Sequence, residues 1–214
     1  MSKVFSAHAV SVDGYISGRD PSDGDGGFGR GLGDAGMLFD WYSDGDTPSQ
    51  VFGGFRLSEP SARVFDALAA RVGAAVAGRT TYEHSSHFGG GGPHPTARLF
   101  VLSHRWAPEI SGRQTLLTTG IADAIAAARE AAGDKDAGLM GGGVPTSPPE
   151  ANLADEAIHH HAPIPLDAGR SPLPRAPKAP EPPTPRRRPA PGATPPPQRG
   201  SPTIPVTWRA DNPR

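Results

Sequence analysis

The chain has 214 residues and no cysteine, which excludes disulfides, zinc thiolates and catalytic thiols and suits a reducing compartment. Its formal charge of −1 hides an acidic body, with 13 basic and 20 acidic residues over positions 1–170. Such a body argues against a nucleic-acid-binding domain, which needs a basic face. No run of about 18 apolar residues occurs, so we expect no membrane span, no signal peptide and a cytoplasmic location.

Proline content divides the chain near residue 170. Residues 171–214 hold 15 of the 26 prolines, together with eight basic residues. This composition is typical of low-complexity sequence. We therefore expect one domain over residues 1–170 and a disordered Pro/Arg-rich tail over residues 171–214. The tail run Arg186-Arg187-Arg188 is interpreted as solvated in preference to a nucleic-acid or membrane contact.

Short apolar runs alternate with helical patterns along the body. We expect a loop at 19–36, an aromatic segment at 37–42 packed on the domain, and a helix within 56–72 whose inner face carries Val64, Leu68 and Val72. A second helix is expected at 121–132, ended by Gly133. This alternation predicts an α/β fold with a largely parallel sheet and helices on its faces. The expected strands are residues 3–12, 72–77, 97–103, 115–119 and 137–140.

One strand-to-helix turn suits an anion. Gly78 lets the backbone turn and lets a ligand approach, and Arg79 adds a fixed cation. Thr80 or Thr81 can serve as N-cap of the following helix, whose free N–H groups would face a phosphate. An ordinary turn explains the same residues equally well.

Two further turns of the same kind follow later strands. Ser103 and Arg105 could hold a phosphate monoester by charge-assisted hydrogen bonds. At Gly141, Gly142 and Gly143 the bare main chain could approach a pyrophosphate. In an open α/β sheet, ligands bind outside the carboxyl ends of the strands, so the three turns can converge. The GxGxxG fingerprint of the usual dinucleotide fold is absent.

In this order the motifs Gly78-Arg79-Thr80-Thr81-Tyr82-Glu83, Val101-Leu102-Ser103-His104-Arg105 and Met140-Gly141-Gly142-Gly143 resemble the dihydrofolate reductase-like family. The opening Val10-Ser11-Val12-Asp13-Gly14-Tyr15-Ile16-Ser17-Gly18 is similar to its branch in the reductase domain of bacterial bifunctional riboflavin-biosynthesis deaminase-reductases. The resemblance covers about residues 3–170. It implies a three-layer fold with a mixed, mostly parallel sheet flanked by helices.

The resemblance also implies NADPH as cofactor. Gly78, Arg79, Thr80 and Thr81 would contact its phosphates, Ser103 and Arg105 would bracket the 2′-phosphate, and Gly141, Gly142 and Gly143 would follow the pyrophosphate. The small-molecule substrate would be an aminopyrimidine, such as 5-amino-6-(5-phosphoribosylamino)uracil, or a pterin-like ring. No nucleic-acid or membrane partner is implied, and a homodimer stays open.

Asp13 is the proposed catalytic residue, because a carboxylate at that end of the first strand could orient an amino-pyrimidine or assist proton delivery. A turn-forming role for Asp13 is the competing interpretation. Asp40 and Trp41 are alternatives, since folate-reducing relatives carry an acid on a nearby helix.

The sequence departs from the family from about residue 144. Pro148 and Pro149 would each cost about 3 kcal/mol inside the helix expected there. Residues 153–164 still resemble the family's next strand, with Pro163 and Pro165 restricting it to an edge or to irregular pairing, and Gly169-Arg170 would form the following turn. We hypothesise that the final third is divergent or read in a shifted frame. The alternative function is then a catalytically degenerate nucleotide-binding protein, and a third is an interaction protein working through the tail.

The run His159-His160-His161 invites a metal interpretation. Side chains alternate across a strand, so at most His159 and His161 share a side. Without a further ligand nearby in the sequence, we expect no metal site.

Overall fold

The computed structural model describes residues 2–19, 32–105, 110–141 and 154–172, all within one unit of the chain, residues 1–176. The glycines Gly142 and Gly143, the divergent segment 144–153 and the tail from residue 173 lie outside the described residues. The expectations placed on them, including the boundary at 170, stay predictions.

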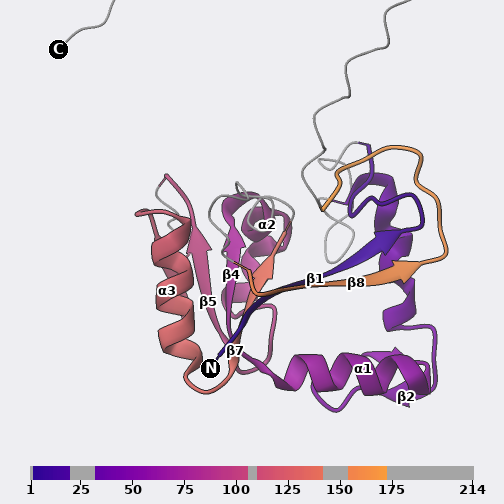
Figure 1. Ribbon diagram of the computed structural model, residues 1–214, viewed down its shortest axis with the longest axis horizontal. Coiled ribbons are helices and arrows are strands. Elements are labelled where there is room, and N and C mark those ends of the chain that lie inside the picture. The colour runs from indigo at the N-terminus through magenta and orange to yellow at the C-terminus, as the bar shows by residue number, and fades with distance from the viewer. Residues whose placement is uncertain (1, 20–31, 106–109, 142–153, 173–214) are drawn as a thin grey trace, which may run out of the picture. The chain divides into compact units, whose positions relative to one another are not determined.

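A six-stranded sheet forms the centre of this unit (Figure 1). Its order is β6-β5-β4-β7-β1-β8, and every pairing in it is parallel. The predicted parallel α/β sheet is therefore confirmed, and the edge position predicted for residues 153–164 is that of β8. The strands are β1 (Val4–Ser11), β4 (Val72–Gly78), β5 (Arg98–Leu102), β6 (Gln114–Leu117), β7 (Asp136–Met140) and β8 (Glu156–Ala162).

Helices cover both faces of the sheet, which gives the predicted three layers (Figure 1). On one face, α3 (Ile121–Ala132) packs Ala124, Ile125 and Ala128 onto Val76 and its strand neighbours. On the opposite face, α2 (Arg79–His84) packs its buried Tyr82 against the sheet. Further along that face, η1 (Gly33–Tyr42) buries Ala35 and Leu38 against Ala9 and Ala162. Small apolar residues of β4 point alternately to the two faces of the sheet, so α3 and α2 can each pack closely on it.

The remaining elements form an aromatic cluster beside η1. Ser58 caps α1 (Glu59–Ala70), its side chain accepting a bond from the Ser61 N–H, and a short antiparallel pair joins β2 (Thr47–Pro48) to β3 (Arg56–Leu57). The predicted packing of aromatic residues is confirmed, because neighbouring rings lie 4.3 to 5.9 Å apart. Its rings are those of Phe39, Trp41, Tyr42, Phe52, Phe55 and Phe65.

Two sequence expectations are wrong in detail. Val64 was expected on the inner face of α1, yet it is 60 % exposed, and Ala62 and Ala69 are the residues buried there. The spacing 64, 68, 72 marks a stripe on the helix, but the small alanines allow closer packing and define the inner face instead. The loop expected to reach residue 36 also ends earlier, because η1 begins at Gly33.

A left-handed turn, η2 (Ser86–Gly90), follows α2. Three of its residues other than glycine, Ser86, His87 and Phe88, have positive φ values of 49°, 57° and 51°. Such conformations are unfavourable for L-residues. Gln114 offsets the cost, since its buried amide donates to the carbonyls of His87 (2.7 Å) and Gly91 (2.9 Å).

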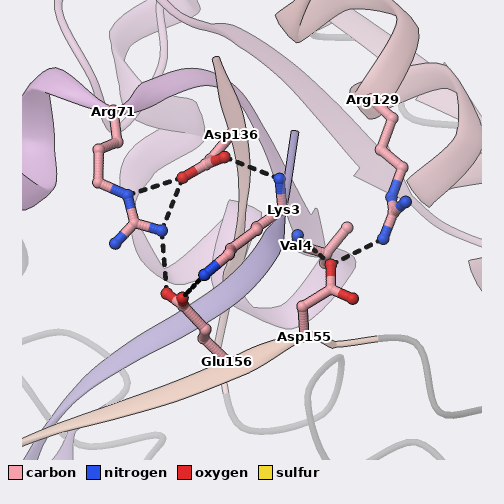
Figure 2. Close-up of polar contacts among 7 residues, drawn as sticks. All are labelled: Lys3, Val4, Arg71, Arg129, Asp136, Asp155 and Glu156. Carbon is pink, nitrogen blue, oxygen red and sulfur yellow. Dashed lines mark hydrogen bonds and ion pairs between the residues drawn. The ribbon is translucent and has the colours of Figure 1, made fainter. Parts of the chain in front are cut away.

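Ion pairs hold the amino-terminal end of the sheet together (Figure 2). Arg71 bonds Asp136 (2.7 Å) and Glu156 (2.9 Å), so it joins α1 to β7 and to the edge strand β8. Lys3 also pairs with Glu156, and its backbone N–H donates to Asp136. The network lies at the end of the strands opposite the three candidate turns, and its role is therefore structural.

Candidate functional site

The three predicted turns lie at the carboxyl ends of three neighbouring strands. The first follows β4, the second follows β5 and the third follows β7, and β4 lies between the other two. From β4 the chain continues to β5 on one side, whereas from β7 it continues to β8 on the other. This divergence is a topological switch point, where open α/β sheets bind ligands. The fold thus brings together motifs that are up to 63 residues apart, from Gly78 to Gly141.

The helix after Gly78 differs from the prediction. Gly78 itself is the N-cap, α2 begins at Arg79, and no side chain bonds the helix end, so neither Thr80 nor Thr81 is the cap. With only six residues, α2 provides a short dipole. Any affinity of this turn for an anion would therefore come mainly from the Arg79 guanidinium and the free backbone N–H groups.

Arg79 links the first turn to the second. Its Nη1 lies 3.4 Å from Ser103 Oγ, and its Nε donates to Glu83 (2.6 Å). Ser103 is buried and its hydroxyl is used locally, because it donates to the Arg105 carbonyl (2.9 Å) and accepts from the Arg105 N–H (3.1 Å). Ser103 therefore shapes the turn, and the exposed side chain of Arg105 is the group the turn offers to a ligand.

Gly141 links the third turn to the first. It has a φ of +77°, and a Cβ added there would collide with Thr81 Oγ1. Only glycine combines this backbone conformation with so close an approach. Because Gly141 has no side chain, the end of β7 can lie directly against α2. A bare main chain is also what a close approach to a ligand requires.

Asp13 lies at the same edge of the sheet, two residues after β1, and its carboxylate is fully engaged. It accepts bonds from Ser11 Oγ (2.5 Å) and from the backbone N–H groups of Leu166 (3.1 Å) and Asp167 (2.7 Å). The Ser11 hydrogen bond, followed by these backbone bonds, keeps the pKa of Asp13 below its ordinary value. Asp13 is therefore an ionised acceptor that ties the segment after β8 to the end of β1. This geometry favours orientation over proton donation.

The expected turn at Gly169-Arg170 lies beside this tie. Arg170 pairs with Ser17 in an isolated antiparallel bridge, and the Ile16 N–H donates to the Arg170 carbonyl (2.8 Å). A Cβ on Gly169 would collide with the Ser17 carbonyl oxygen. The loop after β1 is thus held by the segment that follows β8.

The alternatives Asp40 and Trp41 lie on η1, apart from the three turns. Trp41 packs against His160 of β8, with 5.3 Å between ring centroids. Asp40 lines a surface cavity of about 330 Å³ together with Phe39, Tyr42 and Phe55. Neither residue contacts the turns through any bond described in the structure, so their roles as alternatives stay predictions.

His8 is the residue that the sequence reasoning missed. It lies on β1 beside His159 of β8, and both its ring nitrogens are buried from solvent. Burial, and then the neighbouring His159, lower the pKa of His8 to about 4, although a weak hydrogen bond with the Gly141 backbone opposes this shift. A histidine among the small apolar residues of the first strand was the available signal.

The histidine run is divided between the two faces of the sheet, as predicted. His159 and His161 share one face, with ring centroids 6.0 Å apart, whereas His160 packs on Trp41 on the other face. Across the described residues, no group of three His, Cys, Asp or Glu side chains is placed to hold a metal ion. Nor does any described helix have the length and apolar character needed to cross a membrane.

No protein-family model and no curated protein matches the sequence. Among solved structures, a candidate riboflavin biosynthesis protein from Shewanella sp. PV-4 matches 83 % of this chain and 86 % of its own, with a TM-score of 0.54. The two proteins share a fold. Their sequences are 24 % identical, so the likeness shows a shared fold and does not extend to the chemistry. The predicted fold is thereby confirmed.

Proposed function

We propose that this chain is an NADPH-dependent reductase of the dihydrofolate reductase-like type, closest to the riboflavin-pathway branch. One observation carries the proposal: the structure joins the three turns pairwise, Arg79 to Ser103 and Gly141 to Thr81, at the switch point of a parallel sheet. NADPH carries three phosphate groups, two in its diphosphate and one on the adenosine 2′ oxygen, and convergent turns with guanidinium groups and a close main chain suit them.

The residues present fit this cofactor. The exposed Arg105 and the partly exposed Arg79 would meet the phosphate charges, and the Gly141 main chain would lie along the diphosphate. When bound, the nicotinamide would supply a hydride to the substrate. The protein would hold the two rings in contact and exclude water. Asp13, ionised and tied to the loop after β8, would orient the amino group of an aminopyrimidine or pterin-like substrate.

Titration of the full chain with NADPH tests this proposal directly. We expect quenching of tryptophan fluorescence and a raised melting temperature, because a ligand that binds only the folded state stabilises it. No binding of NADPH or NADH by either method would refute the reductase. Oxidation of NADPH in the presence of 5-amino-6-(5-phosphoribosylamino)uracil or dihydrofolate, followed at 340 nm, would then identify the substrate class.

A second candidate is a nucleotide-binding protein without turnover. The occupied carboxylate of Asp13 favours it, since that group cannot donate a proton near neutral pH. Tight NADPH binding with no oxidation on any aminopyrimidine or pterin tested would support this candidate against the reductase.

A further inference from the structure

The last described segment, residues 154–172, runs along β1 as the edge strand β8 and the turns that follow it, drawn in orange in Figure 1. We name this segment the strap. Among the pairings described, β7 reaches residues 4–6 of β1, whereas β8 pairs with residues 5–11. The carboxyl half of β1, residues 7–11, therefore has the strap as its ladder partner and loses that partner if the strap leaves.

Apolar burial contributes little to holding the strap. Of the seven residues of β8 one is buried, Ala162, whereas six of the eight residues of β1 are buried. Beyond β8, Leu166 joins Ala162 in packing on Ala35 and Leu38 of η1. Segments with few buried apolar contacts open at a lower free energy than the core of a protein. The strap is therefore suited to opening locally, while the rest of the sheet stays folded.

Carboxylates tie the amino-terminal end of the strap (Figure 2). Asp155 accepts a hydrogen bond from a backbone N–H of β1 (2.7 Å) and pairs with Arg129 of α3 (2.8 Å). Glu156 pairs with Arg71 at the end of α1 (2.9 Å) and with Lys3. Bonds of this kind are strong because one or both partners are charged. They weaken when the carboxylate takes up a proton.

A carboxylate also ties the other end of the strap. Asp13, in the loop after β1, accepts from the backbone N–H groups of Leu166 (3.1 Å) and Asp167 (2.7 Å). Close by, Arg170 pairs with Ser17 in an isolated bridge. Here the strap supplies the donors and the loop supplies the charge. The strap that completes the ladder of β1 thus also fixes the direction of the Asp13 carboxylate.

Acid acts on the strap in one direction. Hydrogen-bonding partners hold the pKa values of Glu156 and Asp13 below their ordinary values, so the docked state is stabilised at neutral pH and loses this contribution in acid. Burial lowers the pKa of His160, which therefore takes up a proton more readily once the strap opens. From η1, the uncharged Trp41 ring lies against His160. The charged or titratable groups facing the strap are Lys3, His8, Asp13, Arg19, Arg71, Arg129 and Asp136, and β8 itself carries His159, His160 and His161.

We propose that residues 154–172 are an acid-released strap, which docks on β1 and leaves it as one unit, and that docking orients Asp13 and the loop after β1. The three candidate turns follow β4, β5 and β7, so they lie outside the strap. The strap does not depend on the proposed function, and only its consequence for catalysis rests on that function. The docked fraction is highest near neutral pH and decreases as pH falls.

Amide hydrogen exchange of the full wild-type chain, corrected for intrinsic exchange rates, tests the strap. We expect the amides of residues 156–162 and 7–17 to share one opening free energy, lower than that of β4 and β5. Their protection should be about tenfold lower at pH 5 than at pH 7, because one linked proton changes an opening equilibrium by up to tenfold per pH unit. Strap amides as protected as those of β4 and β5, or protection that does not change with pH, would overturn the proposal.

Two double variants test the ties at the amino-terminal end. Asp155→Asn with Glu156→Gln should lower the protection of the strap and of residues 7–17 at pH 7, because two charged acceptors are lost. Glu130→Gln with Asp134→Asn removes the same charge from exposed carboxylates on and after α3, and it should leave that protection unchanged. An equal loss of protection in both double variants would assign the effect to net charge and refute the ties.

Gly169→Ala acts at the opposite end of the strap. A Cβ there would collide with the Ser17 carbonyl oxygen, so the substitution should loosen β8 and residues 7–17 together while β4 and β5 stay protected. Loosening confined to residues 166–170 would show that the strap does not move as one unit. If the Asp155→Asn, Glu156→Gln protein does not fold, this variant and the wild-type chain decide. Failure of NADPH to bind would refute the reductase and leave these exchange results unaffected.

Discussion

Gly141 lies so close to Thr81 that a methyl group at position 141 would overlap the threonine hydroxyl. The contact joins the end of β7 to the start of α2 and fixes the distance between the third and first turns. Both the positive φ of +77° and the contact with Thr81 require glycine at position 141.

Replacing Gly141 with alanine should destabilise the protein by roughly 1–3 kcal/mol, because the residue must adopt an unfavourable φ and displace Thr81. Urea denaturation measures this change. Gly36→Ala is the matched control, since a Cβ there meets nothing within 4 Å, and it should leave the midpoint nearly unchanged. A Gly141→Ala protein as stable as the control would contradict the close contact.

Arg105→Ala should weaken NADPH binding about tenfold while leaving NADH binding within about twofold, because the loss of one charge-assisted bond to a phosphate is worth about 1.4 kcal/mol. Fluorescence titration with both cofactors gives the ratio. Arg63→Ala removes an exposed guanidinium from α1 and should alter neither affinity. An equal loss for NADH and NADPH would rule out a 2′-phosphate contact at Arg105.

The Arg71–Glu156 network should make the folded state less stable at acidic pH. Lys3, and then Arg71, hold the pKa of Glu156 below its ordinary value of 4.5. A carboxyl with a depressed native pKa stabilises the fold at neutral pH, and the contribution disappears as pH falls through that pKa. Glu156→Gln should therefore lower the melting temperature at pH 7 but have little effect at pH 3. Glu130→Gln, on the exposed face of α3, should match wild type throughout.

His8 should also make the fold less stable in acid, over a higher pH range than Glu156. Its native pKa of about 4 lies below the unfolded value of 6.5, so the unfolded chain binds the extra proton between these values. Stability should therefore fall as pH drops from 7 to 4, by up to about 1.4 kcal/mol per pH unit. His8→Gln should flatten this slope in urea titrations at pH 7, 6 and 5. A slope that persists unchanged in the variant would assign it to other groups.

Gln114 should be among the costliest polar residues to remove. Its amide donates to the His87 carbonyl of the left-handed turn and to the Gly91 carbonyl just after it, and its oxygen accepts from Tyr82 (3.1 Å) and the Ser111 N–H (3.3 Å). Gln114→Leu removes all four of these hydrogen bonds and should cost roughly 2–4 kcal/mol. Tyr82→Phe removes one bond and should cost about 1 kcal/mol. Thermal melts that rank the two variants in reverse would show that the turn does not depend on Gln114.

Much of the fold could be predicted because its signals are local. The apolar runs around Val76 and Val101 and the pattern from Ile121 to Gly133 each specify an element without reference to the rest of the chain. The spacing of Val64, Leu68 and Val72 predicted a helix at α1 but not its inner face, because Ala62 and Ala69 carry little hydrophobic signal and are buried only by what packs on them.

The candidate site, like the fold, could be predicted only in part from the sequence. Sequence alone determined which turns follow which strands, and therefore that Gly78, Ser103, Arg105 and Gly141 would lie at one edge of a parallel sheet. Only the tertiary structure decided what each group does there, because hydrogen-bond partners come from distant parts of the chain. It assigned the Ser103 hydroxyl to its own turn, tied Asp13 to a segment about 150 residues away, and buried both ring nitrogens of His8.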